Sequence, residues 1–139
     1  MDLLGGIFGF NRLSPLELAH EVIRATNARD YEALGTLCGK RFVFVDGEGS
    51  RVEGCDEFVT AVKALVAAAP DFTLDIDRYD VTGENVVMHG QTSSSNPDFT
   101  SEALWRMVVR RGRVQFLENY VASAKQRLVN FVPQQAAAG

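Results

Sequence analysis

The sequence predicts an α+β domain in which a cone-shaped, strongly curved sheet, antiparallel or mixed, wraps around three N-terminal helices. Two observations carry this prediction. The first half of the chain holds three segments with helix-start signals and apolar residues at helical spacing. The second half changes to an alternation of period two that is broken by turn residues, which is typical of strands with one wet face. Helices followed by strands favour an α+β fold, and a curved sheet closed by helices leaves a pocket.

Each predicted helix has its own boundary signals. Ser14-Pro15-Leu16-Glu17 combines an N-cap residue, a proline at the first helical position and a glutamate three residues after the cap. After a break at Asn27-Ala28-Arg29, Asp30 is expected to cap a short second helix. Asp56 is expected to cap the third helix, which should end before Pro70.

The remaining regular segments are predicted to be strands. Phe42-Val43-Phe44-Val45 is rich in aromatic and β-branched residues and stops at the Asp46-Gly47 turn. The expected strands span residues 42–45, 51–53, 72–77, 86–91, 102–109 and 114–121. Residues 93–99 are expected to form a polar loop, and residues 124–132 a closing helix or an arm.

Length and composition favour one globular domain. The chain has 139 residues, of which 46% are hydrophobic and 23% charged, as in ordinary soluble proteins. A net charge of -4 with scattered basic residues argues against nucleic-acid binding. No segment has transmembrane length and the apolar start lacks a basic n-region, so we expect no membrane association and a cytoplasmic location. Cys38 and Cys55 lack metal-ligand spacing and are expected to be plain core residues.

Three stretches are expected along the chain: an apolar N-terminal arm (1–13), the folded domain (14–123) and a C-terminal extension (124–139). The extension ends in the low-complexity run Gln134–Gly139. The apolar residues of the arm are expected to pack against the domain or a partner subunit; they are Leu3, Leu4, Ile7, Phe8 and Phe10.

The order of these signals resembles the nuclear-transport-factor-2-like (NTF2-like) superfamily, and within it the SnoaL-like and ketosteroid-isomerase-like branch. The resemblance covers about residues 14–122 and is carried by Asn27-Ala28-Arg29-Asp30, Asp46, Gly54 and Gly112-Arg113-Val114. It implies a cystatin-like fold around a hydrophobic pocket that takes a small apolar or polyketide-like molecule. It also implies a protein without a cofactor or metal, and a homodimer that forms through the convex face of the sheet.

The resemblance places a candidate catalytic base at Asp46. Ketosteroid isomerases combine such an aspartate with a tyrosine and a protonated aspartic acid. Here Val22 occupies the tyrosine position, and the position of the acid falls on Ala103 or Trp105. Ala122 stands where many SnoaL-like chains have an aspartate on the final strand. These replacements favour a cyclase-like or ligand-binding member over a steroid isomerase or an epoxide hydrolase.

Asp46 has two interpretations that the sequence leaves open. The residue shares strand parity with Phe42 and Phe44, so if these aromatic rings face the cavity, its carboxylate lies at the rim and can act as a general base. Asp46-Gly47 is also a common turn pair. The function is accordingly expected to be either that of an isomerase or cyclase, or that of a non-catalytic ligand-binding or dimeric interaction module.

Strand parity also predicts which side chains face the cavity. His89, Glu118 and Tyr120 are expected on the convex face. Asn119 is expected inside, where its neutral amide can orient a ligand carbonyl or hydroxyl. The candidate ligand-binding residues are Val22, Phe44, Phe58, Val62, Met88, Trp105, Met107, Leu117 and Asn119.

Overall fold

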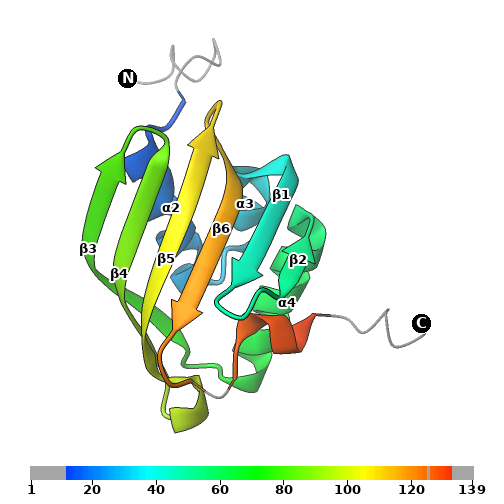
Figure 1. Ribbon diagram of the computed structural model, residues 1–139. Helices are drawn as coiled ribbons and strands as arrows, with labels where there is room; N and C mark the ends of the chain where they lie inside the picture. Colours follow the sequence, from blue (N-terminus) through cyan, green and yellow to red (C-terminus); the bar gives the residue numbers. More distant parts are fainter. Residues whose placement is uncertain (1–11, 125, 133–139) are drawn as a thin grey trace.

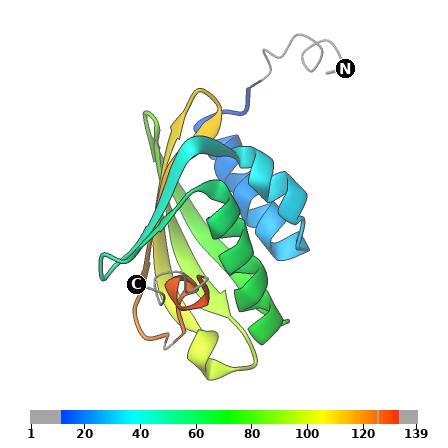
Figure 2. The same cartoon turned by 90° about the vertical axis from the view of Figure 1, so that its right-hand side faces the viewer.

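In the computed structural model, three helices cover one face of a six-stranded sheet. The structure describes residues 12–124 and 126–132, so the predicted packing of the apolar residues between 1 and 11 lies outside the described residues. The helices are α2 (Pro15–Ala28), α3 (Tyr31–Leu37) and α4 (Cys55–Ala68). Figures 1 and 2 show them together on one side of the sheet, which leaves the opposite face uncovered by any described helix.

The sheet is mixed and open. Its strands are β1 (Cys38–Asp46), β2 (Arg51–Glu53), β3 (Thr73–Thr82), β4 (Asn85–Ser93), β5 (Ser101–Arg110) and β6 (Arg113–Val121). They lie in the order β2-β1-β6-β5-β4-β3 (Figure 1), and among the neighbouring pairs only β1–β6 is parallel. The predicted α+β architecture, with a mixed sheet around three N-terminal helices, is therefore confirmed.

Two of the three predicted helix caps are confirmed. The Glu17 backbone N–H donates to Ser14 Oγ at 3.1 Å, and the Glu17 carboxylate accepts from the Ser14 N–H at 2.9 Å. Asp30 Oδ1 accepts from the Ala33 N–H at 3.2 Å at the start of α3. The prediction for Asp56 is wrong, because the cap is Gly54 at φ 94°, a backbone angle that favours glycine. Asp56 lies in the first turn, where its charge suits the helix dipole.

The break between α2 and α3 anchors these helices to the edge of the sheet. The side-chain amide of Asn27 donates to the Leu74 carbonyl and accepts from the Leu74 N–H, both at 2.9 Å, as a neighbouring strand would. Arg29, with φ 61°, closes α2 and donates to the carbonyls of Pro70 and Phe72 at 2.8 and 2.7 Å. The segment therefore fixes α2 relative to β3, which is an edge strand.

β3 is longer than predicted because a bulge hides its periodicity. The register between β3 and β4 shifts between Ile76 and Arg78, so the inward parity changes and Tyr79 pairs with the buried Met88. The alternation of apolar and polar residues in the sequence therefore breaks after residue 77, and the predicted strand ends there. The strand itself continues to Thr82. Gly90 lies opposite the bulge, where a Cβ atom would be only 1.9 Å from the Asp75 carbonyl oxygen.

Two short 3-10 helices complete the described chain. One, η1 (Pro97–Phe99), lies inside the predicted polar loop, and the other, η2 (Leu128–Phe131), lies in the predicted extension. Figure 2 shows η2 beside α4, at the end of the molecule opposite the β5–β6 turn. None of the described helices has the length and apolar character needed to cross a bilayer.

Candidate functional site

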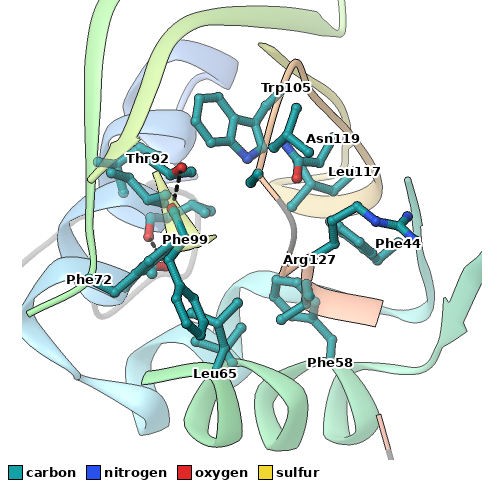
Figure 3. A pocket seen from close by; sticks show the side chains of 18 of the residues that line it. Phe44, Phe58, Leu65, Phe72, Thr92, Phe99, Trp105, Leu117, Asn119 and Arg127 are labelled. Atoms are coloured by element: carbon teal, nitrogen blue, oxygen red, sulfur yellow. Dashed lines mark hydrogen bonds between the residues drawn. The ribbon is translucent and has the colours of Figure 1, made fainter. Parts of the chain in front are cut away.

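A cavity lies between the concave face of the sheet and the helices, and it holds about 80 Å³. α2 and α4 form one wall, strands β1 and β3 to β6 form another, and residues after β6 line one end. In Figure 3, Phe58 and Leu65 of α4 lie across the cavity from Trp105 and Leu117 of the sheet. Most of the wall is apolar, as in many small-molecule sites.

The structure brings eight of the nine candidate ligand-binding side chains together around this cavity. They are Val22, Phe44, Phe58, Val62, Met88, Trp105, Leu117 and Asn119. The ninth, Met107, is fully buried but does not line the cavity. It faces inward as predicted, but it lies two residues beyond Trp105, about 7 Å further along β5. Parity alone does not specify how far along a strand the cavity extends.

Asp46 is buried beside the cavity but is not one of its lining residues. The residue is 4% exposed, and its Oδ1 accepts from the backbone N–H groups of Glu48 and Ser50, each at 3.0 Å. Its Oδ2 accepts from Arg127, which lines the cavity and also lies 3.2 Å from Glu48. One carboxylate oxygen of Asp46 therefore stabilises the turn, as the turn interpretation expects, and the other forms an ion pair with the C-terminal segment.

Few polar groups in the wall are available to a ligand. The Thr92 hydroxyl donates to the Phe99 carbonyl at 2.7 Å, and the Thr26 hydroxyl donates to the Val22 carbonyl at 2.8 Å. With the Asn119 amide oriented by its neighbours, its oxygen accepts from Trp105 Nε1 at 3.0 Å. The polar groups of the cavity that remain are thus concentrated at two places, the Asn119–Trp105 pair and the neighbouring Gln126 and Arg127 side chains.

The positions that the resemblance assigns to a tyrosine and an acid contribute apolar surface instead. Val22 and Trp105 both line the cavity, while Ala103 does not. Ala122, where many relatives have an aspartate, is exposed just after β6. No described group in the cavity wall is a carboxylic acid able to donate a hydrogen bond to a developing oxyanion.

Twelve residues of the cavity wall were not among the candidates: Ile23, Thr26, Leu65, Phe72, Leu74, Thr92, Phe99, Val121, Ala124, Gln126, Arg127 and Leu128. Phe72 and Phe99 flank the strands at one end, and the signal for Phe99 is a single large aromatic residue inside a polar loop. Gln126, Arg127 and Leu128 come from the C-terminal segment. These three residues carry no periodic pattern, so the sequence offers no signal for them.

The convex face holds the residues that parity places there. His89 Nε2 lies 3.0 Å from Arg78 Nη2 and 3.1 Å from Asp80 Oδ2, away from the cavity. Tyr120 is 42% exposed. The pKa of the Tyr120 phenol is raised, first by its hydrogen bond to Glu118 and then by partial desolvation. Within residues 12–124 and 126–132, no three His, Cys, Asp or Glu side chains gather to hold a metal ion.

Comparison with known proteins relates this geometry to one family. The family model described as the SnoaL-like domain matches residues 19–117. No curated protein matches the sequence. A cystatin-like protein of unknown function from Xanthomonas campestris superposes with a TM-score of 0.72 at 12% identity, over 87% of this chain and 100% of that chain.

Two further structures share the fold. A candidate SnoaL-like polyketide cyclase from Shewanella denitrificans superposes with a TM-score of 0.71 at 17% identity, over 78% of this chain and 90% of that chain. An uncharacterised cystatin-fold protein from Novosphingobium aromaticivorans superposes with a TM-score of 0.70 at 18% identity, over 77% of this chain and 97% of that chain. Likeness at these identities establishes the fold, and fold alone does not define chemistry.

Proposed function

Because the chain belongs to the SnoaL-like domain family, we propose that it binds a small, mostly apolar molecule in the cavity between α4 and the sheet. The observation that carries the proposal is the cavity itself, whose wall is formed by apolar side chains from distant parts of the chain. The Asn119–Trp105 pair is the proposed point at which a ligand carbonyl or hydroxyl is oriented.

The volume of the cavity limits the ligand. An engineered protein cavity of about 150 Å³ holds a benzene molecule. The cavity here, at about 80 Å³, has room for a smaller or thinner molecule while the C-terminal segment (residues 124 and 126–132) is in place. A polyketide-like ligand, the larger member of the proposed class, therefore requires this segment to move, because Ala124, Gln126, Arg127 and Leu128 form part of the wall.

Asp46 is proposed to position Arg127 rather than to act as the base of an isomerase or cyclase. A general base must reach its proton directly or through one water molecule. Both oxygens of the Asp46 carboxylate already accept hydrogen bonds, and the group that lines the cavity is its partner Arg127. The catalytic alternative requires the ion pair to open when a substrate binds.

Filling the cavity tests the binding proposal. A thermal-shift screen uses 2-butanone and allyl alcohol, which have fewer heavy atoms than benzene and suit the cavity as it stands, and acetophenone and limonene oxide, which require the C-terminal segment to move. At least one probe is expected to raise the melting temperature of the wild-type protein. A ligand at 100 times its Kd adds about 2.7 kcal/mol of stability. Val62→Phe places a ring in the cavity and is expected to abolish the shift, because Val62 is buried in its wall.

The matched control is Val81→Phe, the same substitution at a 45% exposed position outside the cavity wall. This variant is expected to keep the full shift. Circular dichroism shows whether both variants are folded. Equal shifts in wild type and a folded Val62→Phe variant would contradict binding in this cavity, and silence with every probe would favour the non-catalytic interaction module.

The convex face is proposed to form a homodimer. Leu104 pairs with Tyr120 and Val108 pairs with Phe116 across β5 and β6, and all four side chains are at least partly exposed. Between these pairs, Arg106 Nε donates to Glu118 Oε1 at 2.8 Å. A twofold axis through this face can place the Arg106 of each copy near the Glu118 of the other, so the face is complementary to itself.

Sedimentation velocity tests this proposal. Wild type is expected to sediment as a dimer, and Leu104→Glu as a monomer, because a carboxylate would be buried in the interface without a partner. Val81→Glu, which adds the same charge away from this face, is expected to remain dimeric. A dimer with a Kd of about 1 μM would be almost fully formed at about 100 μM protein. If the wild type sediments as a monomer at that concentration, the proposal is contradicted.

A further inference from the structure

The two cysteines of the chain converge on one turn of helix. Cys38 is the first residue of β1, and Cys55 is the first residue of α4. The Cys38 thiol donates to the Leu34 carbonyl at 3.7 Å, and the Cys55 thiol donates to the Gly35 carbonyl at 3.3 Å. Since these acceptors are consecutive carbonyls of α3, the two sulfur atoms occupy neighbouring positions.

The ionisation of each thiol depends on the other. Burial raises the pKa of the Cys38 thiol well above its ordinary value, and the neighbouring Cys55 side chain raises it further. Burial also raises the pKa of the Cys55 thiol, while the neighbouring Cys38 side chain lowers it and the nearby Asp56 carboxylate raises it. Cys55 is therefore the sulfur whose thiolate receives support from its neighbour, and it is also the less buried of the two.

A surface groove reaches both sulfur-bearing residues. Besides Cys38 and Cys55, its lining carries two basic side chains, Lys40 and Arg113, and three acidic ones, Glu53, Asp56 and Glu57. The cavity described above shares none of these residues, so the groove is a separate feature of the molecule. The groove gives a small reagent access to the less buried Cys55, and its mixed charges do not select a reagent of either sign.

We propose that Cys38 and Cys55 are a redox modification site that closes to an intramolecular disulfide in exchange with a small disulfide, for which oxidised glutathione serves as the probe. The Cys55 thiolate attacks one sulfur of the reagent, its S–S bond breaks, and the first glutathione leaves with the proton that Cys55 lost. The Cys38 thiolate then attacks the Cys55 sulfur and releases the second glutathione, which takes the proton of Cys38. The two protein thiols are oxidised, and one glutathione disulfide is reduced to two thiols.

The disulfide would join the first residue of β1 to the first residue of α4 and close the hairpin from Gly39 to Gly54 into a loop. Both joined elements contribute to the cavity, β1 through Phe44 and α4 through Phe58 and Val62. A cross-link of this kind restricts the unfolded chain, so the oxidised protein is expected to have the higher melting temperature.

The test is mass spectrometry of the intact full chain after incubation with oxidised glutathione. Wild type is expected to lose the mass of two hydrogen atoms, to have no thiol that reacts with iodoacetamide after denaturation, and to recover with dithiothreitol. Cys38→Ser is expected to stop at the first step and gain one glutathione at Cys55. The rate should rise about tenfold per pH unit from pH 7 to 8.5, because only the thiolate attacks.

Three outcomes would overturn the proposal. Wild type that accumulates a stable glutathione adduct lacks the second step. If wild type keeps two free thiols under conditions in which Cys38→Ser is modified, Cys38 and Cys55 do not form a disulfide with each other. A dithiothreitol-sensitive dimer on a gel shows a disulfide between chains instead. A variant that does not fold, judged by circular dichroism, is replaced by Cys38→Ala, which keeps the buried position apolar.

Discussion

Replacing Gly90 with alanine is expected to lower the free energy of unfolding by about 3–5 kcal/mol. The added Cβ atom would lie 1.9 Å from the Asp75 carbonyl oxygen and 2.8 Å from the Ile76 Cα atom. Both atoms belong to the backbone, so no side chain can rotate away, and β3 must separate from β4 at the bulge. β3 has little freedom to do so, because Asn27 holds it through both hydrogen bonds at Leu74.

Gly35→Ala is the matched control. Gly35 lies inside α3, and a Cβ atom there meets no other atom within 4 Å. This substitution is expected to raise stability by about 0.5–1 kcal/mol, because alanine loses less conformational freedom in a helix than glycine. Urea unfolding can be followed by the fluorescence of the single tryptophan, which is buried in the cavity wall. A loss below about 1 kcal/mol for Gly90→Ala would show that the bulge relaxes easily.

Breaking the Asp46–Arg127 pair is expected to have the second largest effect. Arg127→Met leaves a carboxylate that is 4% exposed without its cation, and we expect a loss of about 2–3 kcal/mol in the free energy of unfolding. Asp46→Asn keeps a side-chain oxygen for the turn but removes the charge that faces the guanidinium. The double variant is expected to lose at least about 1 kcal/mol less than the sum of the single losses, because the two residues act as one unit.

The exposed Arg51–Glu53 pair is the control for this cycle. Its side chains are 54% and 70% exposed and lie 3.4 Å apart, so Arg51→Met is expected to change stability by no more than about 0.5 kcal/mol. Additive losses for Asp46→Asn and Arg127→Met would contradict the pairing. Once a substrate is known, Asp46→Asn also tests the catalytic alternative. If Asp46 is the base, Asp46→Asn lowers kcat while ligand affinity is kept, whereas if Asp46 only positions Arg127, the variant loses affinity and keeps kcat.

The sequence was sufficient to predict the fold class because each signal is local. The capping box at Ser14, the cap at Asp30 and the inward parity of Phe44 and Leu117 depend on residues close in the chain. The part of the cavity wall that comes from strands and helices was also predictable from local patterns. Most of its residues are core residues, which the spacing of apolar side chains identifies.

The remaining features depend on contacts between distant residues. The bulge at Ile76 is set by its pairing with β4, so periodicity could not reveal the full length of β3. The cap of α4 is Gly54, which has no polar side chain and whose backbone N–H donates to the Phe42 carbonyl of β1 at 2.8 Å. Arg127 reaches Asp46 across 81 positions of sequence, and no local pattern marks either residue as the partner of the other.

If the cavity binds a ligand as proposed, the C-terminal segment that lines it is expected to influence the kinetics of binding. Where a bound molecule leaves past Arg127, the contacts of this residue with Asp46 and Glu48 are expected to slow dissociation and lengthen residence. For a larger molecule the same contact acts in the opposite sense. The protein must first populate a state with the segment displaced, and the apparent affinity falls in proportion to the rarity of that state. On the proposed function, this ion pair is expected to favour the retention of small ligands and to weaken the binding of large ones.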